Sequence, residues 1–189
     1  MENPPLKLLI QCKGNDRKAH FELYKWCFED MVKICRRYLK QEDELKAAVN
    51  MSFLKLIQSM DKAIEKHEEL VFFHWMRRIT LNHVIDEFRK NKGYKHHVDL
   101  VEDEAIINTH SEPSHDEFSG KAEMANIQHA IDHLPPMSKA VFNLYAVEGY
   151  KHEEIAELLN ISANTSKVHF MRARLKLQEL LGREKSLTS

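Results

Sequence analysis

The residues best suited to chemistry in this chain are hydrogen-bonding and basic side chains that follow a short polar step, Asn160-Ile161-Ser162. Polar side chains can pair with the edges of nucleic-acid bases, and Arg and Lys can hold phosphates. Ser162 is placed to cap a helix and to leave its first amide groups near a phosphate. We therefore predict a helix whose exposed side reads DNA, with these contact residues: Ser162, Asn164, Thr165, Lys167, Val168, Met171, Arg172 and Arg174.

The segment that carries these residues has the pattern of a helix-turn-helix unit. Apolar residues recur at helical spacing from Leu134 to Leu181, interrupted by the polar step. Two helices joined by a tight turn, the second ending in a basic run, are typical of proteins that lay one helix in a DNA major groove. The opposite face of the last helix is expected to pack on its own domain through Ser166, Phe170, Ala173 and Leu177.

Other kinds of chemistry find little support in the residues. His152-Glu153 begins like the zinc-binding HExxH motif, but Ala156 stands where the second histidine would be. We therefore expect no metal ligands, no cofactor and no catalytic residues, and we interpret the twelve histidines as scattered surface residues. The three cysteines form no CxxC pair and are expected to be buried, reduced thiols: Cys12, Cys27 and Cys35.

Composition favours an all-α, cytoplasmic protein. The 189 residues include only five Gly and five Pro, and strong helix formers dominate. No apolar run approaches the ~20 residues that a membrane-spanning helix needs, so no membrane insertion is expected. Seven acidic residues and no Lys or Arg lie between Asp99 and Glu117. Basic residues outnumber acidic ones six to two both in 71–97 and from Asn160 onward, so two basic segments flank an acidic one.

The periodicity predicts two small helical domains, at 1–95 and 122–189, joined by a flexible acidic linker at 96–121. In the second domain we expect helices at about 122–133, 136–147, 152–159 and 163–183. In the first we expect a helix capped at Asn15-Asp16, then helices at about 42–60 and 71–90, with a polar connection or frayed helix between the last two.

Two stripes are expected on the helices of the first domain. The apolar one, on the first helix, consists of His20, Phe21, Tyr24, Phe28, Met31 and Ile34. The stripe on the helix at 71–90 is apolar at its start and polar in its second half, and comprises Trp75, Ile79, Asn82, Asp86 and Arg89. Because Trp75 shares this stripe with Ile79, we interpret it as a core residue rather than a stacking platform.

The chain resembles the sigma-70 family of RNA polymerase sigma factors, specifically the small two-domain extracytoplasmic function (ECF) group. The C-terminal half is similar to the family's region 4 at Leu134-Pro135-Pro136, Val141-Phe142, Glu148-Gly149, Glu153-Glu154-Ile155-Ala156 and Arg172-Ala173-Arg174. The N-terminal half is similar to region 2 at Phe21, Leu23-Tyr24, Phe53-Leu54-Lys55, Trp75-Met76-Arg77-Arg78-Ile79, Asn82, Ile85-Asp86 and Arg89. The resemblance implies a region 2 helical bundle and a region 4 helix-turn-helix.

The resemblance also implies functions and partners. Region 4 would read the −35 promoter element, and region 2 would read and open the −10 element, capturing a flipped base with the loop at about 60–70 and Asn82. The implied partners are promoter DNA, the core RNA polymerase (its β′ coiled coil and β flap) and an anti-sigma factor, with the free protein a monomer. The −10 residues would be Arg77, Arg78, Asn82, Asp86, Arg89 and Lys90, and the polymerase-binding residues Glu42, Asp43, Glu44, Asn50, Phe53 and Lys55.

Two departures from the family pattern stand out. In the polymerase-binding helix, acidic positions of the family are occupied by Lys46, Ala47 and Met51, which weakens or alters the expected contact with polymerase. In the DNA-reading helix, Ser166 lies on the packed face and Val168 on the DNA face, where Val168 could meet a thymine methyl group. Two alternatives therefore stay open: an ordinary helix-turn-helix regulator that binds as a dimer, and a degenerate sigma-like protein with weakened polymerase binding.

Overall fold

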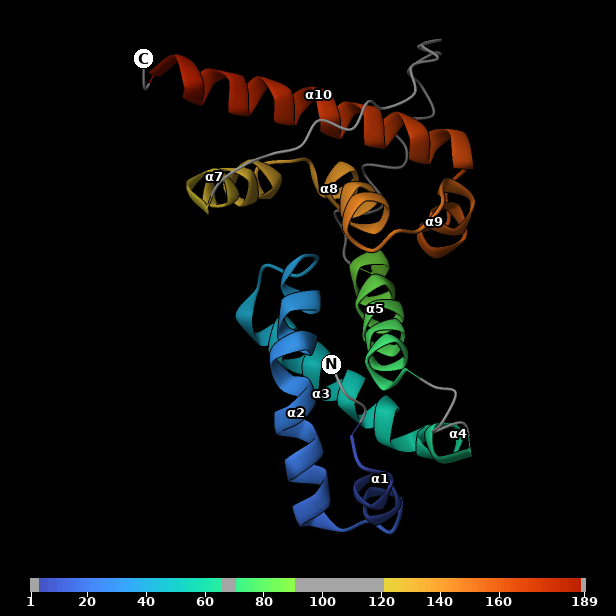
Figure 1. Ribbon diagram of the computed structural model, residues 1–189. Coiled ribbons are helices and arrows are strands. Elements are labelled where there is room, and N and C mark those ends of the chain that lie inside the picture. The colour runs from blue at the N-terminus through green and yellow to red at the C-terminus, as the bar shows by residue number, and fades with distance from the viewer. Residues whose placement is uncertain (1–3, 66–70, 91–120, 188–189) are drawn as a thin grey trace. The chain divides into compact units, whose positions relative to one another are not determined.

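The computed structural model describes residues 4–65, 71–90 and 121–187, and every regular element in these ranges is a helix (Figure 1). The predicted all-α fold is therefore confirmed. The chain divides into two compact units, Met1–Lys90 and Asn91–Ser189. The predicted linker lies outside the described residues except for its last residue, Lys121. Within the described residues, no helix combines the length and apolar character that a bilayer crossing demands.

Unit 1 consists of α1 (Leu6–Lys13), α2 (Arg17–Arg36), α3 (Glu42–Gln58), α4 (Met60–Glu65) and α5 (Phe72–Lys90). Helices α2, α3 and α5 pack on one another, and α1 packs against α2 and α4. The predicted cap of α2 is confirmed, because the Asp16 carboxylate accepts hydrogen bonds from the backbone amides of Lys18 and Ala19. The segment expected as a polar connection or a frayed helix is helical as far as Glu65, since α4 covers Met60–Glu65 and buries Met60.

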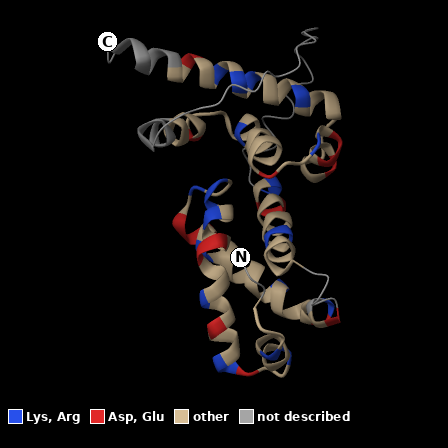
Figure 2. Ribbon diagram, viewed as in Figure 1, with Lys and Arg blue, Asp and Glu red and all other residues tan. Residues whose placement is uncertain are grey.

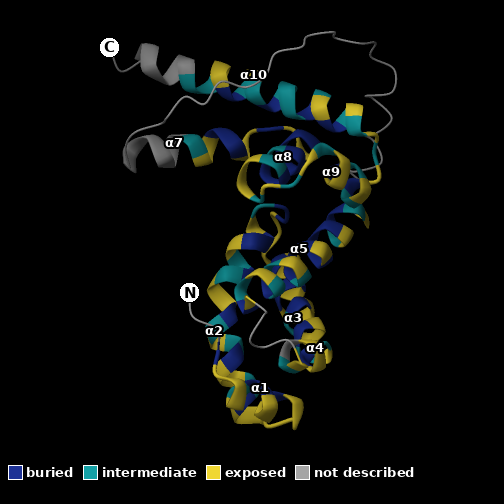
Figure 3. Cartoon of the chain, turned by 45° about the vertical axis from the view of Figure 1, so that its right-hand side comes forward, coloured by how far each residue is buried: buried dark blue, intermediate teal, exposed yellow. Residues whose placement is uncertain are grey.

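The apolar stripe predicted for α2 is partly wrong. Phe21 and Phe28 are 60% and 42% exposed, and the buried face contains Leu23 and Cys27 together with the predicted Met31 and Ile34 (Figure 3). Apolar residues occupy two adjacent faces of α2, and only one of them can face the core formed with α3 and α5. The second face leaves aromatic side chains at the surface of the unit.

The three cysteines are buried and unpaired, as predicted. Burial raises the pKa of Cys27 and of Cys35 to about 12, and burial followed by the nearby Asp16 raises the pKa of Cys12 to about 11. The thiolate is the reactive form, and a free cysteine has a pKa of about 8.5. We therefore expect negligible alkylation by iodoacetamide in the folded protein at mildly alkaline pH. Mass spectrometry should detect three modifications only after unfolding in urea, and rapid labelling of the folded chain would contradict this expectation.

In its described residues, unit 2 contains α7 (Lys121–Asp132), α8 (Pro136–Phe142), the π-helical turn η1 (Asn143–Val147), α9 (His152–Leu159) and α10 (Ala163–Leu187). The predicted helices are confirmed in number and approximate extent, with η1 completing the helix that starts at α8. Helix α10 packs along α7, α8 and α9. Its contact with α7 forms a core cluster with these buried members: Ala130, Ile131, Leu134, Ala173 and Leu177.

Candidate nucleic-acid interface

The turn between α9 and α10 has the geometry that the sequence predicts. Asn160 ends α9 in the left-handed conformation (φ 51°, ψ 51°), and the Ile161 amide donates to the carbonyl of Ala156 at 3.0 Å. The Ser162 hydroxyl oxygen then accepts a hydrogen bond from the Thr165 amide at 2.9 Å, which caps α10. The cap is therefore confirmed, and it leaves Ser162 exposed at the first turn of α10.

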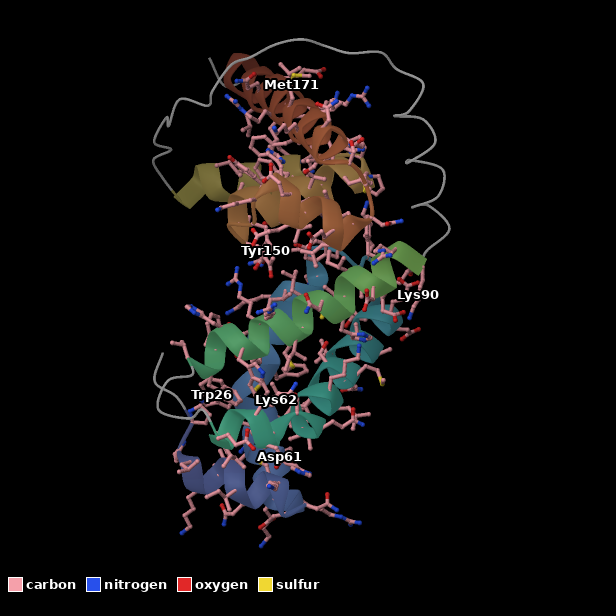
Figure 4. The ribbon with its side chains drawn as sticks, turned by 90° about the vertical axis from the view of Figure 1, so that its right-hand side faces the viewer. Trp26, Asp61, Lys62, Lys90, Tyr150 and Met171 are labelled. Atoms are coloured by element: carbon pink, nitrogen blue, oxygen red, sulfur yellow. The ribbon has the colours of Figure 1, made fainter. Side chains whose placement is uncertain are left out.

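The two predicted faces of α10 differ in burial. On the packed face Ser166, Ala173 and Leu177 are buried and Phe170 is half-buried, as expected. On the other side Asn164 and Lys167 are exposed, and the remaining predicted contact residues are half-buried: Thr165, Val168, Met171, Arg172 and Arg174. Figure 2 marks in blue the positions of Lys and Arg along this helix, and Figure 4 shows Met171 on the side of α10 away from α8.

An aromatic cluster holds α10 against the preceding helices. The Tyr145 ring of η1 stacks on the His152 ring with centroids 4.6 Å apart, and lies 4.5 Å from the Phe170 ring of α10. The Phe142 ring also stacks on Phe170, with centroids 6.0 Å apart. Such packing fixes where the exposed face of α10 points, because an aromatic side chain that contacts three elements allows little rotation of any of them.

The polar Ser166 on the packed face has a partner that the sequence did not suggest. Its hydroxyl group and the Nδ1 of His152 are 2.9 Å apart, and the Ser166 side chain is fully buried. A buried hydroxyl without a partner would be costly, so this hydrogen bond explains how a serine is accommodated there. His152 on the neighbouring helix α9 thus supplies the hydrogen-bond partner that the serine at position 166 needs.

We expect Ser166→Ala to lower the free energy of unfolding of unit 2 by about 1–2 kcal/mol, because it leaves the Nδ1 of the half-buried His152 without its partner. Urea denaturation followed by circular dichroism measures this loss. In a His152→Phe background, which retains an aromatic ring against Tyr145, the same serine change should cause no loss of stability, because the Ser166 hydroxyl no longer has a histidine partner. Equal losses in both backgrounds would show that the hydrogen bond does not stabilise the unit.

The stability of unit 2 should depend on pH through His152. Burial, and then the positive charge of Lys167, lower the pKa of His152 below its usual value, with Glu153 opposing the shift. Below the ordinary histidine pKa of about 6.5 the unfolded chain therefore binds a proton that the folded chain resists. Stability should fall as the pH drops below about 6.5, and His152→Phe should flatten this dependence in urea titrations at several pH values. A slope that persists unchanged in the variant would contradict this assignment.

In unit 1, the predicted stripe on α5 is a surface face. The buried side of α5 contains Phe72, Met76 and Val84, while Asn82 and Asp86 are exposed. Trp75 is half-buried, with its ring edge-on to the buried Phe72 at 5.4 Å, so it packs at the border of the core rather than inside it. The apolar half of the stripe thus lies at the border of the core, and of its polar half Asn82 and Asp86 are exposed while Arg89 is half-buried.

The basic residues predicted on α5 lie toward both of its ends. Arg78 and Lys90 are exposed, and Arg77 and Arg89 are half-buried. Lys90, labelled at the end of α5 in Figure 4, pairs with Glu87 at 2.8 Å, and Arg89 lies 3.8 Å from Asp86. These are exposed pairs between neighbouring turns, which hold basic groups at the surface but add little stability.

The predicted polymerase-binding residues lie on α3 in three different settings. Glu42, Asp43 and Glu44 are exposed in its first turn. Asn50 accepts a hydrogen bond from the Tyr24 hydroxyl at 3.0 Å, and Phe53 packs edge-on to the Tyr24 ring at 5.0 Å. The Lys55 ammonium donates to Nδ1 of His83 on α5 at 3.1 Å.

The exposed surface of α3 also contains an apolar stripe, beside the exposed Lys46 and Asn50. Met51 and Leu54 are 44% and 45% exposed, and Ala47 is also exposed. The surface therefore combines an acidic end at Glu42–Glu44 with an apolar middle, at the positions where acidic residues of the resembled family are missing.

Sequence reasoning missed two buried histidines and one buried lysine. His83 and His169 are 6% and 4% exposed, so the interpretation of all histidines as surface residues is wrong. Each has a side-chain partner, Lys55 for His83 and the Ser138 hydroxyl for His169. Lys139 is also buried and pairs with Asp132. Helical periodicity places all three at core-facing positions, and only their polar character argues against burial.

Comparison with known proteins agrees with this geometry. Residues 124–177 match the family model described as "Sigma-70, region 4". The chain is 24% identical over 89% of its length to the ECF RNA polymerase sigma factor SigE of Mycolicibacterium smegmatis, of which the match spans 63%. It is 28% identical over 80% of its length to RNA polymerase sigma factor SigV of Bacillus subtilis, of which the match spans 84%.

The fold is also found in a solved structure. The sigma factor RpoE of Bartonella quintana, solved with the anti-sigma factor NepR, matches with a TM-score of 0.50 over 85% of this chain and 95% of that one, at 17% identity. The region 4 match covers the helix-turn-helix and its aromatic cluster, and the sequence relatives extend the similarity across both units. The region 4 match and the relatives along both units support an ECF member of the sigma-70 family.

Proposed function

We propose that this protein directs core RNA polymerase to a set of promoters, with α10 reading the −35 element and α5 reading and opening the −10 element. The observation that carries this proposal is the exposed side of α10, which presents Asn164 and Lys167 beside Arg172 and Arg174, opposite the packed face. A rigidly held helix with polar residues at its start and basic residues later is suited to base contacts and phosphate contacts in that order.

Unit 1 supplies the second half of the proposed function. Its −10 surface is the polar half of the α5 stripe, where Asn82 is exposed and Arg78 and Arg89 lie nearby on the helix. An amide can hydrogen-bond to the edge of an unstacked base, and arginines can hold the adjacent phosphates. The proposed loop at 60–70 is in part helix α4, and its residues 66–70 lie outside the described part of the chain.

The proposed partners follow from the same surfaces. The core polymerase would bind unit 1 at α3 through Glu42–Glu44, Asn50, Phe53 and Lys55, with the β′ coiled coil as the contact, and unit 2 through the β flap. An anti-sigma factor is a further proposed partner, since the related RpoE was solved with one. The protein would act as a dissociable, non-enzymatic subunit, monomeric when free, in the cytoplasm where polymerase works.

Run-off transcription with purified core polymerase of its own host and a promoter library tests the proposal. We expect the full chain to produce transcripts that start downstream of a shared pair of elements, at levels well above core polymerase alone. Absence of such transcripts, together with no polymerase subunits co-purifying with the chain, would refute the proposed function. A dimer that binds a palindromic duplex without polymerase would instead identify an ordinary regulator.

The apolar middle of α3 favours a second candidate function. Exposed Ala47 and Met51 replace acidic positions of the family, so the usual charge-based contact with polymerase is reduced. A sigma-like protein with weak polymerase binding would act mainly through another partner. Restoring acids with Ala47→Glu and Met51→Glu discriminates the two: stronger binding to core polymerase supports the weakened contact, and weaker binding shows that polymerase uses the apolar surface as it is.

A further inference from the structure

The exposed side of α10 has an apolar stripe along its centre. Val168, Met171 and Leu175 follow one another at steps of three and four, so they lie within about 60° of one another around the helix. Leu175 is 58% exposed, the second most exposed of the large apolar side chains in the described residues, and the other two are half-buried. Leu175 was not among the predicted contact residues, yet it continues their line by one more turn. An apolar row in the middle of a polar face indicates a binding surface.

Basic side chains border this stripe on both edges. At 100° per residue, Lys167 and Arg174 fall on one side of it, and Arg172 and Lys176 fall on the other. Lys176 also pairs with Glu179 at 2.8 Å. A helix in the major groove has a phosphate backbone on each side and base edges at its centre. The two basic edges therefore match the phosphate backbones of the two DNA strands. An apolar row that bound a protein partner would not need basic residues on both sides.

The apolar centre limits which base edges it can recognise. Among the groups that base pairs present in the major groove, the C5-methyl of thymine is the apolar one, and the others are hydrogen-bond donors or acceptors. Burying a polar base edge against Val168, Met171 or Leu175 would leave that edge without a partner. Asn164, one turn before Val168, continues the line with an amide, which is suited to adenine.

We propose that Val168, Met171 and Leu175 read thymine methyl groups of the −35 element, next to an adenine read by Asn164. The stripe from Val168 to Leu175 is roughly 10 Å long at the helical rise, which corresponds to about three base-pair steps of 3.4 Å. The inference rests on the proposed function and adds a base composition to it: a −35 element with consecutive thymines on the strands that face the helix.

The test replaces thymine by deoxyuridine, which removes the methyl group and keeps every hydrogen-bonding group. Holoenzyme assembled from the full chain and core polymerase is titrated onto the best promoter of the library, with each −35 thymine replaced in turn. We expect affinity to fall about two- to fourfold for each methyl that the stripe contacts. Thymines outside the two promoter elements serve as the control and should tolerate the replacement.

Variants assign each methyl to a side chain. Val168→Ala and Leu175→Ala should each abolish the effect of deoxyuridine at one position and leave it at the others, while Val147→Ala, an exposed apolar residue outside α10, should leave all of them. If promoter-specific transcription persists but no deoxyuridine lowers affinity, the inference is wrong and the proposed function stands. If Leu175→Ala weakens initiation without any dependence on methyl groups, the stripe binds a protein and the inference is equally overturned. Loss of promoter-specific transcription by the parent chain would refute the proposed function itself.

Discussion

Replacing both Lys167 and Arg172 with alanine is expected to weaken promoter binding by holoenzyme about 10- to 100-fold at low salt. The two residues lie on opposite edges of the exposed face of α10, Lys167 exposed and Arg172 half-buried, so each is placed to hold a different strand. Each phosphate contact that is lost should also reduce the slope of log affinity against log salt by about 0.9. The slope should therefore become about two units less steep.

Equilibrium titrations of fluorescent promoter DNA at several salt concentrations measure both quantities. Lys18→Ala with Lys33→Ala is the matched control, because it removes two positive charges from exposed positions on α2 and leaves α10 intact. The control should retain nearly full affinity and an unchanged slope. If it loses as much as the α10 variant, binding follows net charge rather than a helix placed in the groove, and the −35 assignment fails.

The packed face of α10 could be predicted from sequence because its residues recur at helical spacing through much of the helix. Ala173 and Leu177 repeat the spacing of Ser166 and Phe170, and all four lie on the packed side. The helix-turn-helix could also be predicted, since Asn160 provides the left-handed end of one helix and Ser162 caps the next. Local rules determine these features, so a single sequence contains the necessary information.

The faces of α2 and α5 could not be predicted in the same way. Both helices have apolar residues on more than one face, as Phe21 and Phe28 show on α2 and Trp75 on α5, and the choice among faces depends on which neighbours they meet. Periodicity alone does not contain that information. The pairing of His152 with Ser166 joins different helices and requires the tertiary structure, since a buried polar residue is stable only with its partner.

Asn82→Ala is expected to impair promoter opening strongly while leaving the closed complex unaffected. Asn82 is exposed on α5, so its loss should change the stability of unit 1 by no more than about 0.5 kcal/mol. If its amide holds a flipped base, its removal costs the open complex about 1–3 kcal/mol, or about 5- to 150-fold in the amount of melted promoter. Permanganate reactivity of thymines in the −10 element reports melting, and binding at low temperature reports the closed complex.

Gln11→Ala is the matched control, since it removes an exposed amide from α1 and should leave melting unchanged. An abasic nucleotide placed at successive positions of the non-template −10 strand then locates the contact. At the position that Asn82 holds, the parent and the variant should open the abasic promoter equally well, because neither has a base to bind. At every other position the parent chain should open the abasic promoter more efficiently than Asn82→Ala. A defect of Asn82→Ala that persists at all positions would mean that this amide contacts the DNA backbone or supports α5, and no melting defect at all would place the base pocket elsewhere on unit 1.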